Sequence, residues 1–357
     1  MKYTQLGSTN LRVSRLGFGG MRFPYADGKP DLKESVRLLN LGFDKGINFF
    51  DTGNFYCDWQ SEHILGAFMA GKRDKVILST KNGKRETAEF VKDFEQSLKS
   101  LKTDYIDIYH FWALNGGDFK RVMAADGLLE FAYRIKKEGK ARRLAFSFHD
   151  DNPANVKDVI DSGLFESVLL SFNMINRTFG EWLEYAHNKG LGTVVMNPVA
   201  GGAIAEPNPK IKSYGDNARI ALKYLFNLPY INIALAGMGS EAQVLENCET
   251  ASGDYTFTER DKECFENICT VYDSLLRLYC TGCNYCAGCP ENIDIPAVFK
   301  IYNDAKVSWG SWDRAKGRYA ALKTKAGKCS ACGVCMDKCP QKLDIIKHLK
   351  ECEKSLT

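Results

Sequence analysis

The chain has 357 residues, of which 45% are hydrophobic and 26% are charged, and its formal net charge is +4. This length suits one large domain followed by a smaller one, and no stretch approaches the roughly 20 apolar residues of a membrane span. The small net charge and the lack of a recognition motif argue against nucleic-acid binding. We therefore expect a soluble globular protein that binds neither membranes nor nucleic acid.

The first 250 residues repeat a strand-then-helix pattern. Helical segments such as residues 32–45, 87–102 and 127–139 have apolar residues every three or four positions. Eight short β-rich runs alternate with them, at residues 13–19, 47–51, 76–81, 105–111, 143–148, 167–173, 192–198 and 231–236. Eight such units predict an α/β fold of the (β/α)8 TIM barrel type, with the chemistry at the C-terminal ends of the strands. A doubly wound sheet is the alternative, which the lack of a Gly-x-Gly-x-x-Gly turn disfavours.

Polar side chains stand at the expected ends of the second and third strands. Asp51 ends the second strand, Tyr56 follows it, and Lys81 ends the third. A phenol, whose ordinary pKa is about 10, needs a nearby cation to exchange a proton near neutrality. Lys81 can supply that charge, and Asp51 can hold the lysine by a charge-assisted hydrogen bond. Each residue alone could be a cap or a solvated charge, but together they indicate a proton-transfer site.

Two histidines lie near the ends of the next two strands. His110 belongs to the fourth strand, two residues before Trp112, and His149 follows the fifth strand. Alternation along a strand puts His110 and Trp112 on the same side. His110 could therefore reach the barrel mouth, or it could be a hydrogen-bonded histidine of the barrel interior. His149 is a second candidate to polarise or protonate a substrate.

Eight of the 13 cysteines form two tight runs in the last quarter of the chain, each ending in Cys-Pro. The runs are Cys280, Cys283, Cys286 and Cys289, then Cys329, Cys332, Cys335 and Cys339. Three thiolates at every third residue, followed by Cys-Pro, are typical of paired [4Fe-4S] clusters, in which the last cysteine of a run ligates the other cluster. We therefore assign Cys339 to the first cluster and Cys289 to the second. The first run departs from the bacterial ferredoxin spacing by one residue before its last cysteine.

Disulfides and structural zinc are the alternatives for these cysteines. No apolar signal segment opens the chain, so we expect a reducing cytoplasm in which thiols stay reduced. Zinc sites use paired Cys-x-x-Cys knuckles rather than a third cysteine at the same interval. About forty residues separate the two runs, including a helix-like stretch at residues 295–304. We therefore predict a barrel at residues 1–272 and a small, largely helical ferredoxin-like domain with two 4Fe-4S clusters at residues 273–357.

The sequence around Tyr56 resembles the aldo-keto reductases. The matching motifs are Asp51-Thr52-Gly53-Asn54-Phe55-Tyr56, Ser61-Glu62, Lys81, Leu16-Gly17-Phe18-Gly19-Gly20-Met21-Arg22, Gly139-Lys140 and Gly237-Met238-Gly239-Ser240 with Glu246-Asn247. The match spans roughly residues 3–250, and with the cysteine runs the chain resembles the branch of that family fused to a ferredoxin module. The resemblance implies an oxidoreductase that interconverts a carbonyl and an alcohol with NAD(H) or NADP(H). Tyr56 would be its general acid or base, supported by Lys81 and Asp51.

The resemblance also implies a nucleotide site with three departures from the family. The implied contacts are Gly20, Met21, Ser147, Asn173, Asn197, Gly237, Ser240, Gln243 and Asn247. Trp112 replaces the catalytic histidine of the family, and Leu169 replaces the glutamine that holds the carboxamide. Residues 237–242 contain no basic residue for the 2′-phosphate of NADP. The last two departures argue against strong selectivity for NADP, and they also weaken the evidence that the protein binds any nicotinamide nucleotide.

Iron–sulfur clusters on such a barrel need a reason, because hydride transfer requires no one-electron carrier. In the leading hypothesis the clusters carry out electron transfer. In an alternative, the protein is a reductase or lyase that takes electrons from ferredoxin or flavodoxin and does not use nicotinamide. In a third, it is a non-catalytic redox sensor. Residues 300–357 contain 13 Lys and Arg against 6 Asp and Glu. This excess either balances the anionic clusters or attracts an acidic electron carrier. Clusters of this kind are usually oxygen-labile, so we expect an anaerobic or microaerobic host.

Overall fold

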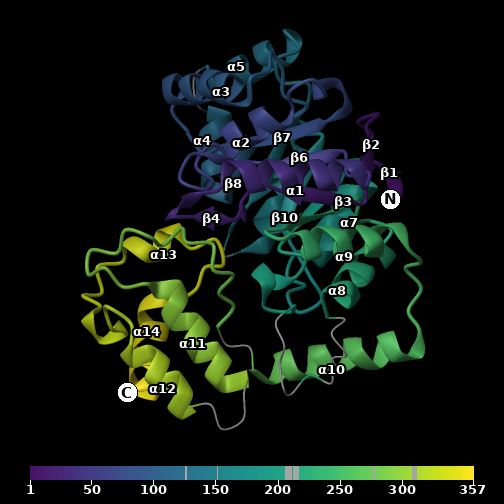
Figure 1. Ribbon diagram of the computed structural model, residues 1–357. Helices are drawn as coiled ribbons and strands as arrows, with labels where there is room; N and C mark the ends of the chain where they lie inside the picture. The colour runs from purple at the N-terminus through teal and green to yellow at the C-terminus, as the bar shows by residue number, and fades with distance from the viewer. Residues whose placement is uncertain (125–126, 151, 206–210, 212–216, 276–277, 308–311) are drawn as a thin grey trace. The chain divides into compact units, whose positions relative to one another are not determined.

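The computed structural model describes residues 1–124, 127–150, 152–205, 211, 217–275, 278–307 and 312–357 (Figure 1). They form two compact units, of which the first contains residues 1–198 and 222–256 and the second contains residues 199–221 and 257–357. The domain boundary predicted at residue 272 falls inside helix α10 (Glu259–Leu275). That boundary stays a prediction.

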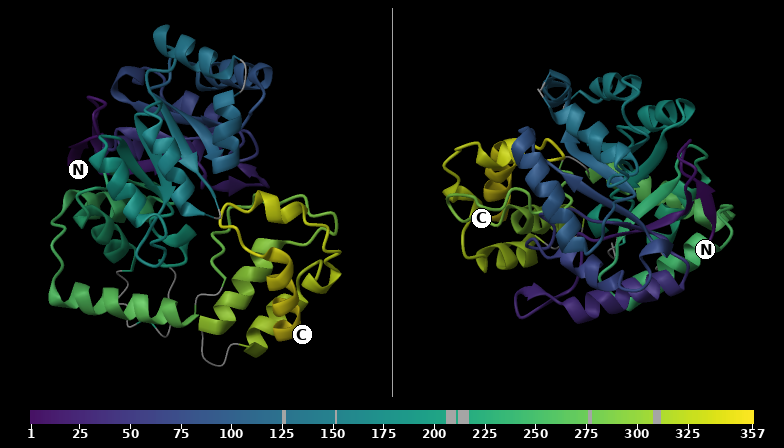
Figure 2. Two further views of the ribbon diagram at one scale, coloured as in Figure 1. Left: turned by 180° about the vertical axis from the view of Figure 1, so that it is seen from behind. Right: turned by 90° about the horizontal axis from the view of Figure 1, so that it is seen from above.

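A closed barrel of eight parallel strands forms the first unit (Figure 2). The strands are β3 (Leu16–Gly19), β6 (Phe49–Asp51), β7 (Ile77–Asn82), β8 (Ile108–Leu114), β9 (Leu144–Phe148), β10 (Ser167–Ser171), β11 (Gly192–Met196) and β12 (Ile233–Gly237). They follow chain order around the barrel, and β12 pairs with β3 to close it. Every residue of β6, β9 and β10 is buried, because helices cover the outside and side chains fill the inside. The predicted (β/α)8 barrel is confirmed.

The helices of this part of the chain alternate with the strands. They are α1 (Leu32–Asp44), α2 (Ser61–Phe68), α3 (Thr87–Leu101), α4 (Gly116–Ala124), α5 (Leu128–Lys137), α6 (Val156–Asp161), α7 (Gly180–Asn188), α8 (Asn217–Asn227) and α9 (Glu241–Ser252). In α1 the buried face includes Leu38, Leu39 and Gly42, as a spacing of three to four residues requires. The Asp31 side chain caps this helix by accepting a hydrogen bond from the Glu34 N–H.

The strand predicted at residues 13–19 is two strands in the structure. Strand β2 (Arg12–Ser14) pairs with β1 (Tyr3–Gln5) in an antiparallel hairpin, and only β3 enters the barrel. The Ser14 N–H donates to Asn48 Oδ1 at 2.7 Å and the Ser14 hydroxyl donates to the Leu16 carbonyl at 2.7 Å. These bonds redirect the chain between the two strands, and an apolar pattern does not reveal them. A second small hairpin pairs β4 (Tyr25–Ala26) with β5 (Lys29–Pro30).

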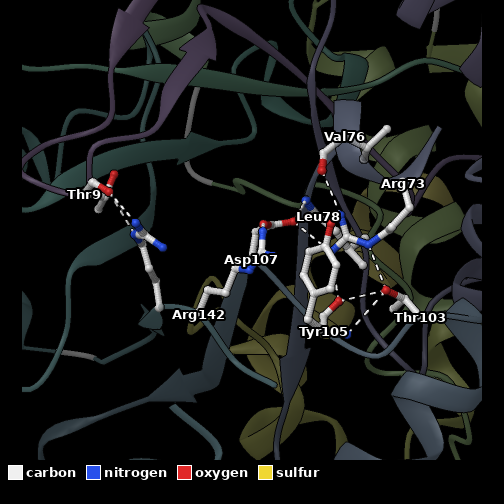
Figure 3. A network of polar contacts seen from close by, with 9 residues as sticks. Thr9, Arg73, Val76, Leu78, Thr103, Tyr105, Asp107 and Arg142 are labelled. Atoms are coloured by element: carbon white, nitrogen blue, oxygen red, sulfur yellow. Dashed lines mark hydrogen bonds and ion pairs between the residues drawn. The ribbon is translucent and has the colours of Figure 1, made fainter. Parts of the chain in front are cut away.

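One buried carboxylate fastens three strands at their N-terminal ends (Figure 3). Asp107, just before β8, accepts a hydrogen bond from the Leu78 N–H of β7 at 3.0 Å. It also pairs with Arg73 at 2.8 Å and with Arg142, just before β9, at 3.1 Å. Both guanidinium groups lie over the Tyr105 ring, at 3.8 and 3.6 Å from its centroid. The N-terminal end of a TIM barrel contributes to stability and not to catalysis. We therefore infer that this network of polar contacts fixes the register of the three strands.

The second unit is largely helical in its C-terminal part. Besides α10 it contains α11 (Ile295–Val307), α12 (Trp312–Ala320), α13 (Val334–Lys338) and α14 (Ile345–Leu356). Helices α11 and α14 pack together around Val298, Phe299 and Leu349, and they run from the end that carries α13 toward the end that carries α12 (Figure 1). The predicted helix at residues 295–304 corresponds to α11. Within the described ranges, no helix combines the length and apolar character needed to cross a bilayer.

Candidate active site and cysteine-lined cavities

A buried ion pair occupies the C-terminal ends of β6 and β7. Lys81 Nζ donates to Asp51 Oδ2 at 2.5 Å and to the Thr52 carbonyl at 2.7 Å. The Ser79 hydroxyl donates to Asp51 Oδ1 at 2.7 Å. Burial raises the pKa of Asp51 and lowers the pKa of Lys81, and the attraction between the two opposes both shifts. The lysine is therefore held rigidly inside the barrel mouth.

Tyr56 lies beside this pair. Lys81 Nζ is 5.2 Å from the centroid of the Tyr56 ring, and only 8% of the tyrosine is exposed. The next three residues, 57–59, all have left-handed backbone, with φ between 50° and 66°. Non-glycine residues adopt this region at a cost, and such strain gathers at functional sites. The structure thus brings Asp51, Tyr56 and Lys81 together in one place.

The two histidines are differently placed. His110 pairs with Lys81 in strand register and is 1% exposed, and its Nδ1 has no hydrogen-bond partner among the described residues. Burial, and then the charge of Lys81, hold the pKa of His110 well below its usual range, so the ring is neutral near pH 7. His149 is only partly buried, and its ring centroid is 6.5 Å from that of Trp112.

Two aromatic rings, those of Phe55 and of Trp112 in β8, lie in a chain of contacts that begins at Tyr56. The Phe55 ring centroid is 4.9 Å from that of Tyr56 and 4.7 Å from that of Trp112. The indole of Trp112 fits because Gly83 has no side chain: a Cβ there would lie 2.6 Å from the indole ring. Sequence reasoning noted Trp112 only as a missing histidine and did not identify Phe55.

Arg85 holds the irregular end of β8 that carries Trp112. Its guanidinium donates to the Trp112 carbonyl at 2.8 Å and to the Ala113 carbonyl at 3.3 Å, and it pairs with Asp118 at 3.2 Å. Ala113 has φ 52°, and its N–H donates to Ser147 Oγ at 2.9 Å. Burial lowers the pKa of Arg85. Sequence reasoning missed this residue, although a basic residue just past the third strand was a usable signal.

The glycine-rich ends of β3 and β12 are neighbours. Gly19 and Gly237 face each other in strand register. A Cβ on Gly237 would lie 2.7 Å from Cγ of Arg22, so the Arg22 side chain packs on this glycine. A basic residue thus lies beside Gly237, although residues 237–242 themselves contain none. The sequence hid it because the two segments meet only when the barrel closes.

The other nucleotide candidates at this side make local bonds. The Gly20 N–H donates to the Asp51 carbonyl at 2.7 Å, and the partly buried Met21 follows it. Ser240 caps α9 by accepting from the Gln243 N–H at 3.4 Å, while Gln243 Oε1 accepts from the Gly239 N–H at 2.8 Å. Asn247 is partly buried on α9.

The candidates for the carboxamide side interact with one another. Asn173 Nδ2 donates to the Asn197 carbonyl at 2.8 Å, and Asn197 Nδ2 donates to Ser171 Oγ at 3.2 Å. Ser147 accepts a backbone N–H through its oxygen and so keeps its hydroxyl proton for a further bond. Leu169 is 1% exposed in the barrel core.

Two cavities of the second unit are each lined by four cysteines. The first has about 330 Å³ of empty space, with Cys280, Cys283, Cys286 and Cys339 in its wall. The second has about 310 Å³, with Cys289, Cys329, Cys332 and Cys335 in its wall. Each cavity thus gathers three cysteines of one run and the last cysteine of the other. This is the grouping that we assigned from the spacing.

The thiols in each cavity act on one another electrostatically. Burial raises the pKa of Cys286 to about 12, and Cys283, Cys280 and Cys339 raise it further. Burial also raises the pKa of Cys335, and Cys329, Cys289 and Cys332 add to the shift. Raised pKa values keep these groups as thiols unless a cationic centre is bound, and soft sulfur ligands with apolar walls such as Ile295 suit an iron–sulfur cluster.

The crossed grouping predicts which variants should behave alike. If each cavity holds one of two equal clusters, Cys339→Ser should lose the same cluster as Cys280→Ser, and Cys289→Ser the same cluster as Cys329→Ser, each with about half of the iron remaining. Anaerobic iron and sulfide determination with electron paramagnetic resonance of the reduced protein measures this. Cys352→Ser is the control, because Cys352 is buried and lines neither cavity. If Cys339→Ser matched Cys329→Ser, the crossing would be wrong.

A second buried carboxylate lies behind the ion pair, at the start of α2. Glu62 is 2% exposed and accepts a hydrogen bond from the Thr80 hydroxyl at 2.7 Å. Burial raises the pKa of Glu62 to about 7; the Thr80 bond and Lys81 oppose this shift, and Asp93 adds to it. Glu62 therefore holds its proton more tightly than an exposed glutamate does.

This carboxyl makes barrel stability depend on pH. The folded state holds the Glu62 proton more tightly than the unfolded state does. The stabilisation of the fold by protonated Glu62 is therefore fully present below about pH 4.5 and is lost as the pH rises through about 7. We expect Glu62→Gln to gain about 2–3 kcal/mol in unfolding free energy relative to wild type between about pH 5 and 8. Anaerobic urea unfolding measures it, with the exposed Glu181→Gln as control. Parallel profiles for Glu62→Gln and wild type would contradict the prediction.

Comparison with known proteins gives two matches along the chain. The Aldo/keto reductase family matches residues 15–219, and a 4Fe-4S dicluster domain matches residues 279–344. L-galactose dehydrogenase of Arabidopsis thaliana is 28% identical over 274 residues, which cover 68% of this chain and 85% of that protein. Uncharacterized oxidoreductase YqkF of Bacillus subtilis is 26% identical over 292 residues, covering 71% of this chain and 92% of that protein.

Solved structures show the same barrel fold. The holo form of aldo-keto reductase AKR11C1 from Bacillus halodurans superposes with a TM-score of 0.64 at 24% identity, and it covers 75% of this chain and 96% of that one. At this identity the likeness speaks for the fold alone.

Proposed function

Because this chain belongs to the aldo-keto reductase family and carries a 4Fe-4S dicluster domain, we propose that it is an oxidoreductase that interconverts a carbonyl and an alcohol on a small molecule with NAD(H) or NADP(H). The observation that carries the proposal is the buried Asp51–Lys81 pair beside the ring of Tyr56. The eight cysteines would hold two clusters that exchange electrons with an outside carrier.

The proton step belongs to Tyr56. In the reducing direction its hydroxyl gives a proton to the carbonyl oxygen, and the ammonium of Lys81 stabilises the phenolate that remains. Asp51 and the Thr52 carbonyl keep that ammonium in place, so little reorganisation is needed when charge develops. A bound nicotinamide would supply the hydride. Phe55 limits the access of water to the phenol.

The two histidines take different roles in this proposal. His149, partly exposed beside Trp112, is the one that can contact a substrate. His110 is enclosed next to Lys81, and its neutral ring avoids repelling that cation. We therefore assign substrate polarisation to His149 and a positioning role to His110.

The residues at the strand ends fit a dinucleotide. The Ser147 hydroxyl keeps a proton for the carboxamide, and Asn173 and Asn197 lie close to each other at the end of β10 and β11. Arg22, packed on Gly237, offers a cation for a phosphate. This basic residue restores NADP(H) as a candidate beside NAD(H).

The placement of Arg22 predicts a change in selectivity. We expect Arg22→Gln to weaken NADPH binding about tenfold and to leave NADH binding within twofold, because a charge-assisted bond to phosphate contributes roughly 1.5 kcal/mol or more. Fluorescence titration under anaerobic conditions measures both affinities. Lys33→Gln, at the start of α1, is a control for the loss of one surface charge. Equal weakening of both nucleotides would place Arg22 away from the 2′-phosphate.

A second candidate keeps the barrel and the clusters without nicotinamide. Reduced ferredoxin or flavodoxin would deliver electrons, and the substrate would be reduced or eliminated across without hydride. Leu169 favours it, since a buried leucine stands where the family places the glutamine that holds the carboxamide.

The deciding experiment is an anaerobic titration of the iron-replete protein with NADH and NADPH, in which nucleotide fluorescence and cluster absorbance are followed together. Nucleotide binding with bleaching of the clusters supports the reductase and makes the clusters its electron outlet. No binding of either nucleotide, with bleaching by reduced ferredoxin, would overturn the reductase in favour of the second candidate.

A further inference from the structure

The segment that follows β11 belongs to the second unit. Residues 199–221 cluster with residues 257–357, although their chain neighbours on both sides belong to the barrel. The segment opens with a short 3-10 turn at Ala200–Gly202, in which three successive residues have φ of 53°, 69° and 103°. The turn makes backbone hydrogen bonds of its own, from the Gly202 and Ile204 N–H groups to the Val199 carbonyl, and it also contacts Thr281 and Tyr272.

What it touches first is the backbone of Thr281. A Cβ on Gly201 would lie 2.4 Å from the Thr281 carbonyl oxygen and 3.1 Å from its Cα, so only glycine allows this approach. On the next turn, the hydroxyl of Tyr272 in α10 donates to the Ala203 carbonyl at 2.6 Å. The segment is therefore held at two points within two residues of each other.

Thr281 is also part of the first cysteine-lined cavity. It stands between Cys280 and Cys283, lines that cavity and is 5% exposed. Residues 278–294, all of them described, contain no helix or strand. Attachment of Cys280 and Cys283 to a common centre would constrain the backbone of Thr281, which stands between them.

The other end of the segment joins the nucleotide candidates. Asn197 has left-handed backbone, with φ 60°, and its carbonyl accepts the Asn173 amide. Three residues along the chain separate Asn197 from Gly201. Because the connection is so short, we expect a displacement of Gly201 to affect the backbone of Asn197.

We propose that Thr281 is a positioning residue for residues 199–203, through which loading of the first cluster raises the affinity of the barrel for a nicotinamide dinucleotide. The nucleotide part rests on the proposed function, in which Asn197 contacts the dinucleotide. The positioning part rests on the Gly201–Thr281 approach alone. Loss of the second cluster leaves Thr281 held and changes neither property.

The first test needs no nucleotide. Cys283→Ser removes a ligand from the first cavity and Cys332→Ser removes one from the second. Amide hydrogen exchange over residues 199–204 is measured anaerobically in both variants and in the wild type. We expect at least tenfold faster exchange in Cys283→Ser and wild-type exchange in Cys332→Ser. Equal exchange rates in the two variants would overturn the positioning role of Thr281, whether or not the protein binds a nucleotide.

The second test compares two adjacent glycines. Gly201→Ala would drive a Cβ into Thr281, whereas Gly202→Ala, at the still higher φ of 103°, has nothing within 4 Å of its Cβ. We expect Gly201→Ala to raise the Kd for the bound nucleotide roughly five- to tenfold with kcat little changed and both clusters intact, and Gly202→Ala to stay within twofold. Equal losses would assign the effect to backbone strain and sink the proposal. If the wild type binds no nucleotide, the proposed function fails, and the exchange experiment still decides the role of Thr281.

Discussion

Tyr56→Phe is expected to lower kcat about 10²–10⁴-fold, the range that a positioned proton donor contributes. The variant keeps the ring that packs against Phe55 and loses only the hydroxyl beside Lys81. Nucleotide affinity, cluster content and unfolding free energy should therefore stay near wild type. Anaerobic steady-state kinetics at saturating substrate, with single-turnover measurement of the chemical step, checks this.

Tyr133→Phe is the matched control, because Tyr133 is a half-exposed tyrosine on α5. It should turn over at the wild-type rate. Full turnover by Tyr56→Phe at saturating substrate would remove Tyr56 from the chemistry. The barrel would then need another proton donor, for which the partly buried His149 is a candidate.

Lys81→Met should cost both activity and stability. It leaves the Asp51 carboxylate buried without its partner, and breaking such a pair from one side costs about 3–5 kcal/mol. Removing both charges, in Asp51→Asn with Lys81→Met, should restore most of that loss because no uncompensated charge remains. Both proteins should be inactive, since neither can stabilise the phenolate of Tyr56. Anaerobic urea unfolding and kinetics measure the two effects separately.

The stability cost of Lys81→Met should also depend on pH. Burial raises the pKa of Asp51, and without Lys81 nothing of opposite charge opposes that shift. The variant then holds a proton that the unfolded chain releases above about pH 4, so its deficit relative to wild type grows as the pH rises. A deficit that is the same at about pH 5 and pH 8 would mean that Asp51 stays ionised in the variant.

The barrel could be predicted because its strands are buried on both faces and read as continuous apolar runs. The exception is instructive. Residues 13–19 read as one β-rich run, yet the bonds of Ser14 to Asn48 and Leu16 divide it into two strands of different sheets. Those bonds depend on the position of Asn48 in the folded chain, which no local pattern contains.

The site residues likewise divide into those that the local sequence predicts and those that come together only in the folded chain. Asp51, Tyr56 and Lys81 stand at the ends of neighbouring strands, so their approach follows from strand order. Arg22 and Gly237 meet only because the first and last barrel strands pair, and their contact has no local signal. The packing of Trp112 likewise depends on the glycine at position 83 of the neighbouring strand end.

Because the second unit consists of two separate stretches of the chain, it affects the order in which the protein is synthesised and the places where it can be truncated. The chain passes between the two compact units after residues 198, 221 and 256, whereas a module added to the end of a finished barrel would need one passage. During synthesis, residues 199–221 leave the ribosome well before Asp261, Tyr272 and Thr281, the residues that will hold Arg219, Ala203 and Gly201. We therefore expect expression of residues 1–256 alone to remove contacts of residues 199–221 together with the cysteine-rich part. Gene fusions and truncations that treat the cysteine-rich part as a detachable tag would leave Gly201, Ala203 and Arg219 without these partners.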